Sequence, residues 1–313
     1  MKILFFGTPE FSVPFLDVLI QSKGFSLLAV VTQPDKPMGR GYEVQPSAIK
    51  LQAQHYQLPV LQPKTLRSKE IQKELEDYQA DCFVVVAYGK MIPQEVLDIP
   101  KMGCLNVHPS LLPKYRGPSP MQWAILNGDK ETGVSIMLLD TGMDTGHILT
   151  QEKIPLDPNE TTETLQAKVH HVAPTLLVNT LKMYASGTLS PQSQNNEQAS
   201  LTRLLTKEDG HIDWTQTAKQ IDQQFRALTP WPGMWTIWKR KGKALRLKIL
   251  NMHLLDKKTD SLAGTAQSFS DRLYIQTRTS AMEIIKLQPE GKQEMTAKEF
   301  LKGYGDIQEA KLQ

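Results

Sequence analysis

Residues 81–87 read Asp-Cys-Phe-Val-Val-Val-Ala, and this stretch decides the fold class. A continuous run of apolar, largely β-branched residues is typical of a strand that is buried on both faces of a parallel sheet. Similar short runs at 2–7 and 27–32 predict two more strands, and helical patterns at 13–20 and 71–78 lie between the strands. Strands that alternate with helices predict an α/β domain with a doubly wound, mostly parallel sheet.

The turn after the first predicted strand begins at Gly7 and continues Thr-Pro-Glu-Phe-Ser. The dinucleotide fingerprint Gly-x-Gly-x-x-Gly does not fit these residues, so no NAD site is predicted there. Gly7 is better explained as a tight strand-to-helix turn that leaves little room for a side chain. The sequence also lacks a Cys/His cluster with the spacing of a metal site, so no metal is expected.

The bulk properties predict well-packed cores and no membrane segment. The chain has 313 residues and 40% apolar content, which suits two medium domains. Its two cysteines, Cys82 and Cys104, each lie at the edge of an apolar segment, which favours buried thiols in a reducing compartment. Neither a signal-like N-terminus nor an apolar run of roughly 20 residues occurs. We expect a cytoplasmic protein.

The second half of the chain predicts a different architecture. Residues 163–185 have apolar side chains at helical spacing, with Thr161 or Thr162 as the N-cap, and this helix closes the first domain. A polar stretch follows and reads as a linker. The predicted parts are a first domain at 1–189, a linker at 190–206 and a smaller second domain at 207–313. Beyond a short helix, the second domain has the strand-like stretches of a small β-barrel at 235–239, 244–253, 273–277 and 282–287.

Positive charge is concentrated in the second domain. Residues 207–313 hold 18 Lys and Arg against 13 Asp and Glu, whereas residues 1–206 hold 18 against 20. Three tryptophans lie just before the densest cluster, and cations beside aromatic side chains suit a nucleic-acid surface. The alternative is a solvated hairpin turn with charged flanks. The cluster consists of Lys239, Arg240, Lys241, Lys243, Arg246 and Lys248.

Residues 105–117, Leu-Asn-Val-His-Pro-Ser-Leu-Leu-Pro-Lys-Tyr-Arg-Gly, hold the best candidates for catalysis. Asn106 and His108 are two residues apart in an extended segment, so their side chains leave the same face of the strand. An amide can donate a hydrogen bond to a developing oxyanion, and an imidazole can move a proton. A carboxylate would complete the set. The stretch Leu-Leu-Asp-Thr-Gly-Met-Asp-Thr-Gly at 138–146 follows an apolar run, and we expect its Asp144 to be the partner of His108.

A structural explanation of these residues is also open. Asn106 can cap a turn, and His108 can be a buried histidine with satisfied hydrogen bonds. Asp140 and Asp144 can be Asx-turn residues. The residue types alone do not decide between the two explanations.

Together, the stretches at 105–117 and 138–146 resemble the signature of the folate-dependent formyltransferases. Four further stretches are similar to the methionyl-tRNA formyltransferases within that family: Lys-Ile-Leu-Phe-Phe-Gly-Thr-Pro-Glu-Phe-Ser-Val-Pro-Phe-Leu from residue 2, Gln-Pro-Asp-Lys-Pro-Met-Gly-Arg-Gly at 33–41, Lys-Glu-Asp-Gly-His-Ile-Asp-Trp at 207–214 and Arg-Ala-Leu-Thr-Pro-Trp-Pro-Gly at 226–233. The resemblance implies a Rossmann-like catalytic domain and an OB-like second domain that supports tRNA. It also implies formyl transfer from 10-formyltetrahydrofolate to the α-amino group of methionyl-initiator tRNA, for translation initiation.

The same resemblance implies roles for individual residues. Asn106, His108 and Asp144 are the expected catalytic residues. The expected folate contacts are Tyr88, Gly89, Ile92, Ser110, Leu111, Leu112, Pro113 and Asp140. The expected tRNA contacts are Lys36 and Arg40 in the loop at 33–41, and Lys239, Arg240, Lys241 and Lys243 in the basic cluster.

The chain departs from the family pattern at three positions. Tyr42 and Glu43 follow the Arg-Gly of the loop at 33–41, where relatives often carry lysines. Fewer phosphate contacts are therefore expected from this loop. His147 lies close to the expected site in sequence, and no role is assigned to it.

Two other functions stay open on sequence alone. Another 10-formyltetrahydrofolate-dependent formyltransferase or hydrolase would use the same three residues on an amino sugar, a glycinamide ribonucleotide or water. A non-catalytic RNA-binding module would use the α/β domain as a scaffold. The basic second domain favours tRNA over small acceptors, and the three polar residues argue against a mere scaffold. We expect a monomer with no membrane partner.

Overall fold

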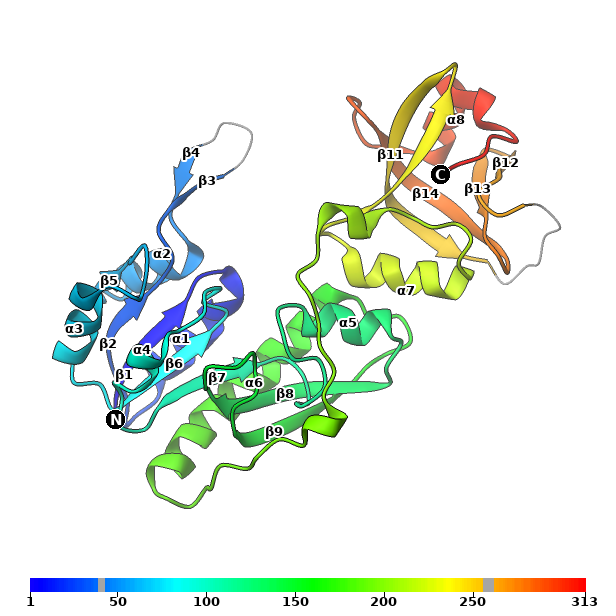
Figure 1. Ribbon diagram of the computed structural model, residues 1–313. Helices are drawn as coiled ribbons and strands as arrows, with labels where there is room; N and C mark the ends of the chain where they lie inside the picture. The colour runs from blue at the N-terminus through cyan, green and yellow to red at the C-terminus, as the bar shows by residue number, and fades with distance from the viewer. Residues whose placement is uncertain (39–42, 256–261) are drawn as a thin grey trace. The chain divides into compact units, whose positions relative to one another are not determined.

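The computed structural model describes residues 1–38, 43–255 and 262–313 (Figure 1), so Arg40 and Tyr42 lie outside the described residues. The chain divides into two compact units. Within the described ranges, no helix is long and apolar enough to cross a membrane. The division into functional domains at 189 and 206 stays a prediction. Unit 1 comprises Met1–Pro120, Glu131–Leu156 and Gln166–Thr202, and unit 2 comprises Met121–Lys130, Asp157–Leu165 and Arg203–Gln313.

Unit 1 is built on a seven-stranded sheet in the order β5-β2-β1-β6-β7-β8-β9. The first five strands are parallel, whereas β8 and β9 are antiparallel to their neighbours. This confirms the predicted doubly wound, mostly parallel sheet. The strands are β1 (Lys2–Gly7), β2 (Ser26–Val31), β5 (Val60–Leu61), β6 (Cys82–Val86), β7 (Cys104–His108), β8 (Glu131–Leu138) and β9 (Ile148–Pro155), and a separate two-stranded ladder joins β3 (Lys36–Met38) to β4 (Glu43–Gln45).

Both faces of this sheet are covered. All five residues of β6 are buried, as its continuous apolar sequence predicts. Phe5 and Phe6 point to opposite faces of β1, yet neither is exposed. Phe6 packs in one core cluster with Leu75, which lies on the helix at 69–77 that follows β5 along the chain. The helices of unit 1 are α1 (Val13–Gln21), α2 (Ala48–His55), α3 (Lys69–Asp77), α4 (Gln94–Leu97) and most of α6 (Thr162–Ala185).

Short polar residues fix the helix starts. The Ser47 and Ser68 hydroxyls accept hydrogen bonds from backbone N–H groups in the first turns of α2 and α3. The Thr161 hydroxyl accepts from the Thr164 N–H at 3.1 Å, so Thr161 is the cap of α6. Cys82 and Cys104 are free and buried, as predicted, and burial raises the pKa of the Cys82 thiol to about 12.

Loops from three parallel strands meet at the carbonyl of Tyr88. The Thr8 hydroxyl donates to this oxygen at 3.0 Å, and Gln33 Nε2 donates to it at 2.8 Å. These residues follow β1, β2 and β6, whose carboxyl ends share one edge of the sheet. Gly7 has little room, as predicted, because an added Cβ would lie 2.8 Å from the Phe5 ring.

Unit 2 is dominated by an antiparallel sheet in the order β10-β11-β14-β13-β12, with β15 beside β14. Its long strand β11 pairs with β10 and with β14, and register shifts around Asn251 bend it. The C-terminal residues join the two edges: Gln313 exchanges backbone hydrogen bonds with Ile237 of β10, and the Ala266 N–H of β12 donates to Ala310. The sheet therefore curls into a partly closed barrel, as predicted.

Buried tryptophans organise the core of unit 2. Trp214 is 3% exposed and donates its Nε1–H to the Thr236 hydroxyl at 2.9 Å. Trp238 is buried and packs beside Phe300. The elements are α5 (Pro120–Leu126), α7 (Ala218–Leu228), β10 (Met234–Arg240), β11 (Lys243–Leu254), β12 (Ala266–Phe269), β13 (Arg272–Gln276), β14 (Ala281–Pro289), β15 (Met295–Thr296) and α8 (Ala297–Tyr304).

Candidate active site

Strand β7 places Asn106 and His108 on the same face of the sheet. The strand pairs in parallel with β6 and in antiparallel with β8, so its backbone is held on both sides. Asn106 is half-buried, and His108 is 4% exposed. The predicted juxtaposition of an amide and an imidazole follows directly from the two-residue period of the strand.

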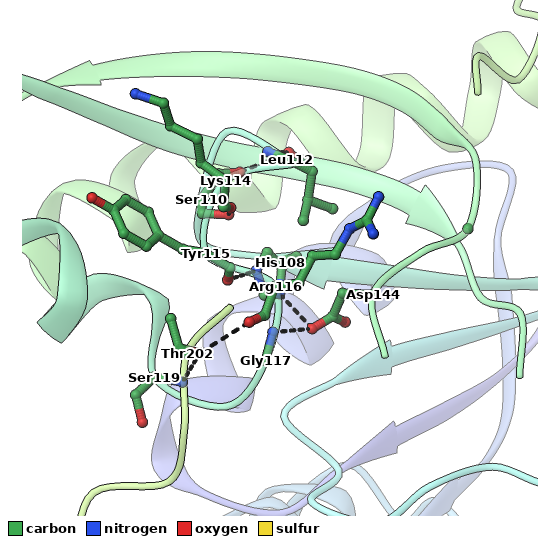
Figure 2. Close-up of polar contacts among 12 residues, drawn as sticks. His108, Ser110, Leu112, Lys114, Tyr115, Arg116, Gly117, Ser119, Asp144 and Thr202 are labelled. Carbon is green, nitrogen blue, oxygen red and sulfur yellow. Dashed lines mark hydrogen bonds and ion pairs between the residues drawn. The ribbon is translucent and has the colours of Figure 1, made fainter. Parts of the chain in front are cut away.

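The His108 ring lies between a carbonyl and a carboxylate (Figure 2). Its Nε2 is 3.0 Å from the Tyr115 carbonyl oxygen, and its Nδ1 is 3.6 Å from Asp144 Oδ2. A carbonyl oxygen only accepts hydrogen bonds, so Nε2 carries a hydrogen. In the neutral ring Nδ1 is then the basic atom, and this atom faces Asp144.

Burial lowers the pKa of His108 below the ordinary value of an imidazole. The charge of Asp144 and the hydrogen bond to Tyr115 act in the opposite direction, and burial outweighs them. His108 is therefore neutral near pH 7, with a base at Nδ1 and an anion beside it to stabilise the protonated form.

Asp144 is held by the loops around it. Its Oδ2 accepts the Gly117 N–H at 2.7 Å, and its backbone has a φ of 53°, in the left-handed region. Gly117 has a φ of 112°, and a Cβ there would lie 2.6 Å from the Thr202 carbonyl oxygen. The close approach that lets the Gly117 N–H reach Asp144 therefore requires glycine.

Asn106 differs from its neighbours because its side-chain amide makes no hydrogen bond with the described residues. The Ser110 hydroxyl, by contrast, donates to the Lys114 carbonyl at 2.6 Å. The Ser135 hydroxyl donates to the Ser110 carbonyl at 2.6 Å and accepts the Leu112 N–H at 3.1 Å. The loop after β7 is thus fixed by hydrogen bonds within itself and to Ser135 of β8, while the Asn106 amide remains available for a ligand.

Residues 192–202 belong to the predicted linker at 190–206, and they pack against the loops around His108. The Gln192 N–H and carbonyl pair with Ile148, and the Thr202 N–H donates to the Arg116 carbonyl at 2.7 Å. The Ser200 hydroxyl accepts the Tyr115 N–H at 2.8 Å. The segment is polar because its contacts are hydrogen bonds rather than apolar packing. The sequence of this segment has neither helical nor strand periodicity, so nothing in its pattern predicted that it packs against these loops.

The residues expected to bind folate fall into three groups. The Tyr88 and Ile92 side chains belong to the core cluster behind the loop, and Tyr88 packs edge-on against Phe6. Gly89 and Asp140 are exposed, and Asp140 Oδ1 accepts from the Gly142 N–H and the Thr145 hydroxyl, which is an Asx-type turn. The remaining four, Ser110, Leu111, Leu112 and Pro113, form the loop that carries the Tyr115 carbonyl to His108. The Tyr88 and Ile92 side chains therefore belong to the core, and the Tyr88 carbonyl is already bound by Thr8 and Gln33.

The loop at 33–41 is anchored at its base. Lys36 Nζ donates to Gln33 Oε1 at 2.7 Å, and Asp35 forms an ion pair with Lys50 at 2.6 Å. The hydrogen bonds from Lys50 and Gln62 lower the pKa of the Asp35 carboxyl group. Arg40, the main expected RNA contact of this loop, lies outside the described residues.

The basic cluster of unit 2 lies on the β10–β11 hairpin, and its cations are in two different states. Lys239, Lys241, Lys243 and Lys248 are exposed. Arg240 instead pairs with Asp306 at 2.7 Å and lies 4.5 Å from the Tyr304 ring centroid. Arg240 therefore fastens the hairpin to α8, which its place in the charge run did not indicate.

An aromatic side chain lies among the free cations. Trp235 pairs directly across the ladder with Lys248. The Arg246 guanidinium lies 3.9 Å from the Trp235 ring centroid, and the His211 ring lies 4.4 Å from it on a tilted plane. By strand alternation, Trp235, Lys239, Arg246 and Lys248 share the outer face of the hairpin.

Comparison with known families matches both parts of the chain. A formyl transferase model covers residues 1–181, and a model of the formyl transferase C-terminal domain covers residues 204–305. A methionyl-tRNA formyltransferase of Caldanaerobacter subterraneus is 41% identical over 97% of this chain and 97% of its own. One from Thermodesulfovibrio yellowstonii is 42% identical over 96% of this chain and 95% of its own.

Solved structures share the fold at lower identity. HypX from Aquifex aeolicus, in complex with tetrahydrofolic acid, aligns with a TM-score of 0.64 at 17% identity, over 98% of this chain and 47% of that one. WlaRD, a sugar 3N-formyl transferase, aligns with a TM-score of 0.64 at 21% identity, over 94% of this chain and 99% of its own. At these identities the likeness concerns the fold alone.

Proposed function

The chain belongs to the formyltransferase family, among the methionyl-tRNA formyltransferases, and on this premise we propose that it transfers the formyl group of 10-formyltetrahydrofolate to the α-amino group of methionyl-initiator tRNA. One observation carries the assignment of the site. The half-buried Asn106 amide has no hydrogen-bond partner among the described residues and leaves the same strand face as the buried His108, whose basic atom faces Asp144. An oxyanion donor beside a base paired with a carboxylate is the set that acyl transfer needs.

Each of the three residues has one task in this reaction. The acceptor nitrogen forms a bond to the formyl carbon, the bond from that carbon to the folate nitrogen breaks, and one proton leaves the amine while the leaving nitrogen takes one up. The Asn106 amide donates to the oxyanion that develops on the formyl oxygen. His108 Nδ1 takes the proton from the amine and passes it to the leaving nitrogen, and Asp144 stabilises the imidazolium that exists in between. The Tyr115 carbonyl holds the ring through Nε2, so the ring does not turn during transfer.

The two substrates are bound by different surfaces in this proposal. The loop at 109–113 and the exposed backbone at Gly89 line the folate, with Asp140 shaping the loop after β8. The tRNA contacts are the exposed lysines of the hairpin, Lys239, Lys241, Lys243 and Lys248, with Lys36 and Arg40 on the loop of unit 1. The enzyme acts as a monomer in the cytoplasm, where aminoacyl-tRNA is used.

The test is transfer of labelled formyl from 10-formyltetrahydrofolate in the presence of methionyl-initiator tRNA, methionyl-elongator tRNA or no acceptor. We expect rapid labelling of the initiator alone. Asn106→Asp keeps the size of the side chain and removes its N–H donor, so kcat falls about 10²- to 10³-fold. Asn179→Asp, an exposed position on α6, is the matched control and keeps the parent rate.

Two results would contradict the proposal. Equal release of formate with and without tRNA would favour a hydrolase. Formyl transfer to an amino sugar, with none to tRNA, would favour the alternative formyltransferase that the same three residues allow.

A further inference from the structure

The side chain of Gln194 lies at the point where three loops around His108 meet. It is half-buried in the segment 192–202, just before the short 3-10 helix at Asn196–Gln198. Its Nε2 donates to the Asp144 carbonyl at 2.8 Å and to the Gly146 carbonyl at 2.7 Å. Its Oε1 accepts the Nε–H of Arg116 at 3.0 Å. Both N–H groups and the carbonyl of this single amide are therefore engaged.

One of these carbonyl oxygens belongs to Asp144, whose carboxylate faces His108, and the other belongs to Gly146, two residues further on. Asp144 has a left-handed backbone, which is uncommon outside glycine although aspartate adopts it more often than most residues, and its neighbours hold it there. Gln194 supplies that hold from the backbone side, and the Gly117 N–H supplies it from the carboxylate side. An amide is the neutral group that can donate twice at one end and accept at the other, so glutamine meets all three requirements.

Arg116 extends the same network toward the loop after β7. Arg116 is 5% exposed, and its guanidinium donates to Gln194 and, through Nη2, to Asn196 Oδ1 at 2.8 Å. Arg116 lies directly between Tyr115, which binds His108 Nε2, and Gly117, which binds Asp144. The Gln194 side chain thus connects the backbone that holds the imidazole to the backbone that carries the carboxylate.

We propose that Gln194 is a positioning residue for formyl transfer, which sets the distance and orientation of the Asp144 carboxylate relative to His108. The inference rests on the proposed function for its kinetic part. It predicts that loss of the amide lowers kcat and leaves the binding of either substrate nearly unchanged, because Gln194 itself contacts neither reacting atom. A displacement of about 1 Å in a catalytic group costs on the order of 10²-fold in rate.

The experiment compares Gln194→Glu and Gln194→Met with the matched pair Gln192→Glu and Gln192→Met. Gln192 is exposed and contacts its neighbours through its backbone. The glutamate removes both donors and places a negative oxygen against two carbonyl oxygens, and the methionine removes the donors without adding charge. We expect kcat to fall about 10- to 100-fold in both Gln194 variants, with KM for both substrates within about threefold of the parent. The Gln192 variants keep the parent kcat.

A second readout does not depend on activity. The Gly117 amide donates to Asp144 Oδ2, so its hydrogen exchange reports the place of the carboxylate. We expect this amide to exchange about tenfold faster or more in the Gln194 variants, while amides in β7 keep the parent rate. A kcat within twofold of the parent, an unchanged Gly117 exchange rate, or a loss of kcat matched by loss of folded protein would overturn the proposal. If the parent transfers no formyl group, the proposed function fails, and the Gly117 exchange still decides the role of Gln194.

Discussion

The loops around His108 and the outer face of the β10–β11 hairpin are both polar, but their polar groups are used in opposite ways. Around His108, the Ser110 hydroxyl, the Asp144 carboxylate and the Gln194 amide are each satisfied by protein partners. On the hairpin, Lys239 and Lys248 are exposed to solvent. The polar groups of the first region are held in fixed positions, and the second region is an exposed, positively charged surface.

This difference predicts different kinds of failure on substitution. A change in the fixed region misplaces groups that act only at the transition state, so it lowers kcat. A change on the charged surface removes a screened, long-range attraction, so it alters tRNA affinity and its dependence on salt.

The largest expected effect is that of Asp144→Asn. The amide keeps the size of the side chain and loses the charge that stabilises the His108 imidazolium, so we expect kcat to fall about 10²- to 10⁴-fold. Steady-state kinetics with both substrates measure it. Asp77→Asn removes an exposed carboxylate on α3 and is the matched control. A variant that retained more than a third of the parent kcat would remove Asp144 from the mechanism.

The same substitution has a consequence for the titration of His108. Burial lowers the pKa of His108, and the charge of Asp144 opposes that shift. In Asp144→Asn the opposing charge is gone, so the pKa of His108 falls further below its usual value of 6.5. The folded state resists protonation of His108, whereas the unfolded chain does not. The free energy of unfolding therefore decreases as the pH falls below about 6.5. Titration of the His108 ring by NMR in both proteins checks the sign, and a pKa that rose in the variant would contradict it.

A smaller effect is expected from Lys239→Glu with Lys248→Glu. Both side chains lie on the outer face of the hairpin with Trp235, and the double reversal removes the two phosphate contacts that we propose for them. We expect about a tenfold loss of tRNA affinity near physiological salt and a salt slope smaller by roughly two, with folate binding unchanged. Filter binding across a salt series measures both quantities. Lys69→Glu with Lys73→Glu on α3 is the control, and an unchanged slope in the hairpin variant would move the RNA surface elsewhere.

The sequence predicted the parts of this contrast that depend on local patterns. The apolar run at 82–86 is buried throughout because a central strand has neighbours on both faces. Asn106 and His108 share a face because strand geometry alone requires it. The lysine-rich run spans the turn of the β10–β11 hairpin and the strand residues on either side of it, and its lysines are exposed.

What the sequence did not predict depends on contacts between distant segments. Gln194 is 50 residues from Asp144, and its stretch has no periodicity, so composition described it only as polar. Arg240 lies in the same run of positive charge as its neighbours. It differs from them only because Asp306, 66 residues away in the sequence, lies beside it. The Tyr88 side chain lies in the core because it packs edge-to-face with Phe6 of β1, which is distant in the sequence.

The smallest expected effect separates Arg240 from the lysines beside it. Arg240 is bound to Asp306 through two nitrogens and lies over two aromatic rings, so its guanidinium is already occupied within unit 2. We expect Arg240→Gln to lower the Tm slightly and to change the salt slope of tRNA binding less than Lys239→Gln does, because only the lysine is free to meet a phosphate. Thermal melts and binding isotherms on the two single variants measure the contrast. Equal salt slopes would mean that Arg240 leaves Asp306 when tRNA binds. The hairpin would then rearrange on binding instead of acting as a rigid platform of free cations.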